Sequence, residues 1–204
     1  MKKILPFLLG LLLATGVAVL PGCSVIVKGE PATLYDLGPL PANPAGALPA
    51  LPPISVADVE APAWLDSSSM FYRLQYANAH QPRPYAQAHW AMAPGQLLSQ
   101  RVKARIVQAG GVALASTYGA VNVPVLRIDA DDFVQNFEAP GQSSARVALR
   151  ASVFIGRTLL AQRTFMQQAP APTPNAAGGA QAMAIASDAA ITDMIDWLGT
   201  LPLK

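Results

Sequence analysis

The chain has 204 residues, with 14 Lys and Arg against 12 Asp and Glu, and 52% of its residues are hydrophobic. Lys2 and Lys3 precede a long apolar run, and without them the chain has 12 basic and 12 acidic residues, a net charge of zero. A nucleic-acid-binding protein needs a basic surplus to displace counterions from phosphates. This balance excludes nucleic acid as a partner, and the length suits a single domain with its own core.

The first 22 residues have the parts of a secretory signal peptide. Lys2 and Lys3 form a positive start, and residues 4–20 form an apolar run without any charge. A transmembrane anchor is the alternative, because about 20 apolar residues span a bilayer. This run is slightly short and is interrupted by one proline and two glycines. We expect residues 1–22 to be a signal peptide that is removed.

The only cysteine lies where the apolar run ends. Leu20-Pro21-Gly22-Cys23 is similar to the lipobox of bacterial lipoproteins, although Pro21 departs from the usual small or β-branched residue. The similarity implies cleavage between Gly22 and Cys23, with diacylglyceryl and N-acyl groups on the cysteine and no other cofactor. A buried structural thiol is the alternative. At about 0.8 kcal/mol per buried methylene, such acyl chains give a stable membrane anchor.

Residues 23–33 are expected to form a lipidated tether, and residues 34–204 the folded domain. In lipoproteins of this kind an aspartate after the cysteine favours retention at the inner membrane, and here that residue is Ser24. The periplasmic face of the outer membrane is therefore the expected location, with the inner membrane as the alternative. Because Cys23 carries lipid, no disulfide is available to stabilise the fold.

Short strands and loops are expected before the first helix. The stretch 39–53 is rich in proline, alanine and glycine and predicts a loop. Patterns typical of strands occur at 34–37, 54–59, 70–74 and 85–90. The last two patterns are weaker, and a turn containing Pro82 and Pro84 is expected between them.

The first helix is predicted over residues 94–109, because proline is tolerated in a first turn and Gly110-Gly111 ends the helix. An apolar stripe repeats every four residues at Leu98, Val102 and Ile106. Three basic residues are expected to point away from that stripe: Arg101, Lys103 and Arg105. They form either a solvated helix face or a patch for anionic lipids, and the solvated face is the favoured interpretation.

The second half predicts an antiparallel sheet and a final helix. A change of alternation between Ala130 and Phe133 indicates a bulge near Asp131-Asp132. Residues 147–155 alternate regularly, Gly156-Arg157 is a turn, and 158–166 return as a strand. After a loop at 169–179, the last helix has an apolar face at Ile191, Met194, Ile195 and Leu198 and a polar row at Asp188, Thr192 and Asp196. The fold class is α+β, a mainly antiparallel sheet packed by two main helices.

No residue pattern indicates catalysis or a metal site. His80 and His89 lack the closely paired spacing of zinc ligands. The cluster Asp129, Asp131 and Asp132 lacks the glycine of a calcium loop, and solvated carboxylates at a sheet edge are the favoured interpretation. No nucleophile elbow or phosphate-binding loop occurs. We therefore expect a protein that is not an enzyme.

Aromatic residues give the strongest indication of a partner surface. Trp, Tyr and Arg are enriched where protein interfaces are tightest. Four such residues are candidates for partner binding, with core packing as the favoured alternative: Trp64, Tyr72, Arg73 and Trp90.

An ordered set of short motifs follows the lipobox: Tyr35-Asp36-Leu37-Gly38-Pro39, Ile54-Ser55-Val56, Pro62-x-Trp64-Leu65-Asp66, Tyr72-Arg73, Tyr85…Trp90-Ala91 and Asp196-Trp197-Leu198. From about Leu34 to Leu198 the chain resembles the ABC-type transport auxiliary lipoprotein family. The long Pro/Ala loop after the first strand departs from the family pattern.

The resemblance implies a non-enzymatic component of a system that moves lipids between the inner and outer membranes. Such systems combine an ABC transporter with mammalian-cell-entry (MCE) domain proteins, so the implied partners are an MCE-domain protein, the membrane and phospholipid. A homo-oligomeric ring would suit a partner with cyclic symmetry. The alternative is an outer-membrane lipoprotein that scaffolds or activates cell-wall enzymes.

Overall fold

The structure, a computed structural model, describes residues 31–42, 48–116, 120 and 122–203. Cys23, the expected signal peptide and most of the expected tether lie outside the described residues. Among the helices of the described part, none combines the length and hydrophobicity needed to cross a bilayer.

Three long consecutive strands form one side of the sheet, with the last of them at its edge: β6 (Val125–Ala139), β7 (Gln142–Ile155) and β8 (Thr158–Pro170). They pair antiparallel, as the sequence predicts. The register shifts between Ala130 and Asp132, which confirms the predicted bulge. Gly156 in the predicted turn has φ +57°, a conformation that glycine adopts without strain.

Five shorter strands complete an eight-stranded sheet: β1 (Thr33–Tyr35), β2 (Ile54–Val56), β3 (Ser69–Leu74), β4 (Ala79–Trp90) and β5 (Ala113–Ala115). The parallel pairs are β1 with β4, β2 with β5, β2 with β6 and β3 with β6, which is four of the seven pairings. The expectation of a mainly antiparallel sheet is therefore wrong, although the class is α+β. Alternation along a strand reports which face is buried, whereas direction depends on crossovers such as the one through α2 (Pro94–Gln108).

The turn expected around Pro82 and Pro84 is wrong, because both prolines lie inside β4. The chain turns earlier, at the four-residue helix α1 (Gln75–Asn78). Strand β1 pairs with β4 only over Ala88–Trp90, so both prolines lie in the part of β4 that has β3 on one side alone. Proline is tolerated there because no ladder partner needs its missing N–H.

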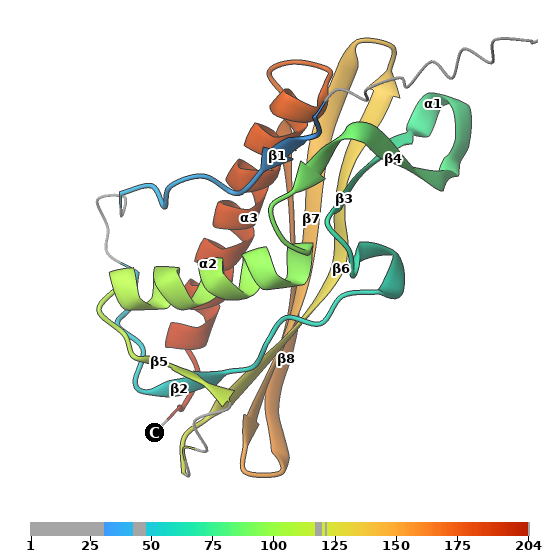
Figure 1. Ribbon diagram of the computed structural model, residues 1–204. Helices are drawn as coiled ribbons and strands as arrows, with labels where there is room; N and C mark the ends of the chain where they lie inside the picture. The colour runs from blue at the N-terminus through green and yellow to red at the C-terminus, as the bar shows by residue number, and fades with distance from the viewer. Residues whose placement is uncertain (1–30, 43–47, 117–119, 121, 204) are drawn as a thin grey trace, which may run out of the picture. The chain divides into compact units, whose positions relative to one another are not determined.

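Helices α2 and α3 (Ala176–Gly199) cover one face of the sheet, with α3 running along β7 and β8 and α2 crossing it (Figure 1). Both predicted apolar faces are confirmed, since their members are fully buried: Leu98, Val102, Ile106, Ile191, Met194, Ile195 and Leu198. Helix α3 begins earlier than the predicted loop allows, because the Asn175 side chain accepts a hydrogen bond from the Gly178 N–H at 2.9 Å and caps the first turn.

Candidate interaction surface

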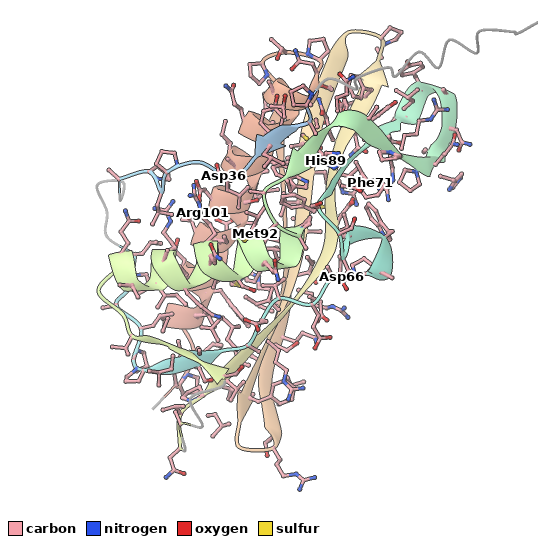
Figure 2. The ribbon with its side chains drawn as sticks, in the orientation of Figure 1. Asp36, Asp66, Phe71, His89, Met92 and Arg101 are labelled. Atoms are coloured by element: carbon pink, nitrogen blue, oxygen red, sulfur yellow. The ribbon has the colours of Figure 1, made fainter. Side chains whose placement is uncertain are left out.

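A stacked group of aromatic and cationic side chains lies around the 3₁₀ turn η1 (Ala63–Leu65) and strand β3. The Trp64 and Phe71 rings meet edge to face with centroids 5.4 Å apart. The Arg73 guanidinium lies 5.1 Å from the centroid of the Trp64 ring. Figure 2 shows Phe71 on β3 and Asp66 at the end of η1. We call Trp64, Phe71 and Arg73 the Trp64 cluster.

The bulge in β6 places a carboxylate beside this cluster. Asp132 lies 3.4 Å from Arg73 Nη1 and 3.2 Å from Arg146 Nε. Burial raises the pKa of the Asp132 carboxyl, although both arginines oppose the rise. The expectation of solvated carboxylates at a sheet edge is therefore wrong for Asp132, because β6 has neighbours on both sides.

Tyr72 points to the opposite face of the sheet from Arg73, because successive side chains alternate along a strand. Its ring lies 4.7 Å from that of Tyr85, whose hydroxyl donates a 2.9 Å hydrogen bond to Gln135. The fully buried Gln135 side chain in turn donates to the carbonyl of Asn175, at the start of α3. Burial raises the pKa of the Tyr85 hydroxyl. This second group faces α3, so the Trp64 cluster lies on the face away from that helix.

The predicted partner residues are thus divided among three places. Trp64 and Arg73 lie together, Tyr72 is half-buried on the α3 side, and Trp90 is part of the core. Trp90 is only 2% exposed, and its ring packs 5.2 Å from that of Phe133. Trp90 therefore packs in the core, which was the alternative to partner binding. For Trp64, Tyr72 and Arg73, partner binding stays a prediction.

A buried charge cluster, which the sequence patterns did not predict, joins α2 to α3. Arg101 Nε and Nη2 each donate a 2.7 Å hydrogen bond to the carboxylate of Asp188, and Arg105 Nη2 lies 3.5 Å from it. Arg101 also donates to the carbonyls of Gly38 and Pro39 in the segment after β1. These contacts fasten that segment to both helices.

The expectation that Arg101 and Arg105 belong to a solvated helix face is wrong, because they are 7% and 2% exposed. Lys103 agrees better with a solvated helix face, since its side chain is half-exposed and forms an ion pair with the exposed Asp58. One signal was present in the sequence: Arg101 and Arg105 follow Leu97 at four-residue spacing, beside the apolar stripe.

The remaining titratable candidates form no obvious reactive arrangement. His80 is exposed at the start of β4. His89, which is labelled in Figure 2, is half-buried near the end of the same strand. Asp129 and Asp131 both pair with Arg150, at 3.6 and 3.1 Å. Within the described residues, no three His, Cys, Asp or Glu side chains gather in a way that could hold a metal ion.

Comparison with solved structures supports the fold. A crystal structure of a Xanthomonas campestris protein assigned to family DUF330 has a TM-score of 0.71 at 21% identity and covers 81% of this chain and 94% of its own. An uncharacterised protein has a TM-score of 0.63 at 15% identity and covers 81% and 97%. No curated protein matches the sequence.

The sequence model described as "ABC-type transport auxiliary lipoprotein component" matches residues 35–195. This match spans most of the chain, from the last residue of β1 into the last turn of α3, and includes the other seven strands and all of α2. The family name places the protein in the cell envelope, associated with a membrane and with an ABC transport system. The chain belongs to the ABC-type transport auxiliary lipoprotein component family.

Proposed function

We propose that the protein is a non-catalytic lipoprotein, anchored by lipid on Cys23 to the periplasmic face of the outer membrane. It works with an MCE-domain protein of an ABC system that moves lipids between the two membranes. The family match carries this proposal, and the lipobox-like Leu20-Pro21-Gly22-Cys23 supports the anchor. The mature charge of zero agrees with a protein or lipid partner rather than a polyanion.

The partner contact is proposed to be the Trp64 cluster. A half-buried tryptophan that carries an arginine on its ring is the kind of anchor that dominates protein interfaces. Arg73 already donates a hydrogen bond to Asp132, so the Arg73 side chain loses little conformational freedom when a partner binds. The cluster also lies on the sheet face that α3 leaves uncovered.

The test is affinity capture of the MCE-domain protein by the full-length lipidated chain and by Trp64→Ala and Arg73→Ala variants. A central anchor of this kind contributes about 2 kcal/mol, which is roughly a thirtyfold loss of affinity. Tyr76→Ala is the matched control, because Tyr76 is an exposed aromatic residue two positions after β3 and outside the cluster.

Three results are informative. Capture by the wild type and by Tyr76→Ala, but not by Trp64→Ala, supports both the function and the surface. Equal capture by all variants, with unchanged circular dichroism, moves the contact elsewhere. If the wild type retains a cell-wall enzyme and no MCE-domain protein, the transport proposal is wrong.

A further inference from the structure

A groove runs along the segment after β1, where that segment passes over α3 towards α2. It consists of two hollows of about 440 and 300 Å³ that share Asp36, Leu37, Gly38 and Ala91. Asp36 on the segment and Arg101 on α2, both labelled in Figure 2, line its second hollow. None of its lining residues belongs to the Trp64 cluster.

The first hollow is lined mainly by hydrocarbon. On α3 it is lined by three small side chains, Ala177, Ala180 and Ala184, and by the exposed Gln181. Its wall includes Leu34 and Leu37. Leu34 is 66% exposed, and Ile185, next to Ala184 on α3, is 59% exposed. Large exposed aliphatic side chains beside an apolar groove are typical of a surface that is covered in function.

The two charged side chains that line the groove, Asp36 and Arg101, already have partners. Among its described lining residues the single cation is Arg101, whose donors go to Asp188 and to the carbonyls of Gly38 and Pro39. The Asp36 carboxylate accepts a 2.7 Å hydrogen bond from the Gly38 N–H. The groove therefore offers contact to a hydrocarbon chain and no free cation for a phosphate.

The groove opens beside the first strand of the domain, close to where the tether joins it. Thr33, the first residue of β1, is ten residues after Cys23. An extended chain spans at most about 3.6 Å per residue, so a lipid on Cys23 keeps β1 within about 36 Å of the anchoring sulfur. The groove therefore lies within about 36 Å of the anchored lipid along the chain, so the lipids of the bilayer are the available ligand.

We propose that this groove binds one acyl chain of a membrane phospholipid, whose head group stays outside the groove. The proposal rests on the lipid anchor of the proposed function and adds a direct contact between the domain and the transported class of molecule. The shape agrees, because three alanines at three- and four-residue spacing on α3 leave an apolar strip beside Leu34 and Leu37, with Gln181 as the one polar side chain that α3 adds to the lining.

The experiment uses full-length lipidated protein in vesicles of phosphatidylethanolamine and phosphatidylglycerol, with a photoreactive benzoylphenylalanine at Ala184. After irradiation, mass spectrometry of the α3 peptide should show an intact phospholipid adduct. Ala189 is the matched control, because it is half-buried on the same helix and does not line the groove. A second probe at the exposed Ala177 covers the case in which the Ala184 variant does not fold.

Adduct at Ala184 or Ala177, at about ten times the level at Ala189, supports the proposal. Equal labelling at all three positions, no labelling in folded protein, or an adduct to the lipid of Cys23 itself would overturn it. Partner capture is measured on the same samples. Lost labelling with retained MCE-domain protein refutes only the groove, whereas lost capture with retained labelling refutes only the partner.

Discussion

Asp188 offers the sharpest test of the energetics, because one carboxylate serves two buried arginines. We expect Asp188→Asn to destabilise the fold strongly, since the amide keeps the size of the side chain but removes its charge. Arg101 then loses one of its two 2.7 Å hydrogen bonds, because one of the two positions facing it becomes an N–H donor, and the remaining bond is no longer to a charged acceptor. Arg105 loses its only carboxylate among the described residues.

The magnitude follows from how deeply these groups are buried. Removing one partner from a buried ion pair costs about 3–5 kcal/mol. The Asp188 side chain is 15% exposed, and Arg101 keeps the carbonyls of Gly38 and Pro39. Both features place the cost near the lower end, at about 3 kcal/mol, which corresponds to a fall in Tm of roughly 6–12 °C for a chain of this size.

Urea and thermal unfolding of the mature chain, followed by circular dichroism, measure this loss. Asp193→Asn on the same helix is the matched control, because Asp193 is exposed and, among the described residues, bonds only to Gln167, so its effect should stay within about 0.5 kcal/mol. If Asp188→Asn and Asp193→Asn unfold at the same urea concentration, the arginine cluster does not fasten the two helices.

Three further changes test other parts of the account. Gly95→Ala should destabilise by about 1–3 kcal/mol despite the better helix propensity of alanine, because its Cβ would lie 2.6 Å from the Val59 carbonyl oxygen; a raised urea midpoint would contradict this. Burial raises the pKa of Tyr85, so the folded state keeps a proton that the unfolded chain releases above about pH 10. Stability should therefore fall as pH rises beyond that value, and less so in Tyr85→Phe, as urea midpoints at several pH values will show. Cys23→Ala should leave the protein without the mass of the diacylglyceryl and N-acyl groups, as intact mass spectrometry of both chains will show; a wild-type chain without that added mass would contradict the anchor.

Sequence predicts the parts of this fold that are governed by local periodicity. The stripe of Leu98, Val102 and Ile106 is visible because apolar residues recur at the helical period, and all three are fully buried. The bulge near Asp131 is visible because the alternation changes parity there. Such signals need only neighbouring residues.

Features that join distant parts of the chain were not predictable in the same way. Arg101 and Asp188 are 87 residues apart, and each alone has the pattern of a solvated helix position. The parallel direction of β3 and β6 depends on the path of the chain through α2, which alternation does not record. The candidate site shows the same limit: the contact between Arg73 and Trp64 and the burial of Trp90 in the core depend on tertiary packing, whereas the opposite orientation of Tyr72 and Arg73 follows from strand alternation.

We propose that this lipoprotein is the auxiliary component of an ABC system that works through an MCE-domain protein. Affinity purification of the full-length lipidated protein from its own membranes, followed by mass spectrometry of the retained proteins, tests it most directly. We expect an MCE-domain protein among them, lost in Trp64→Ala and kept in Tyr76→Ala. Retention of cell-wall enzymes without any transporter component would contradict the claim.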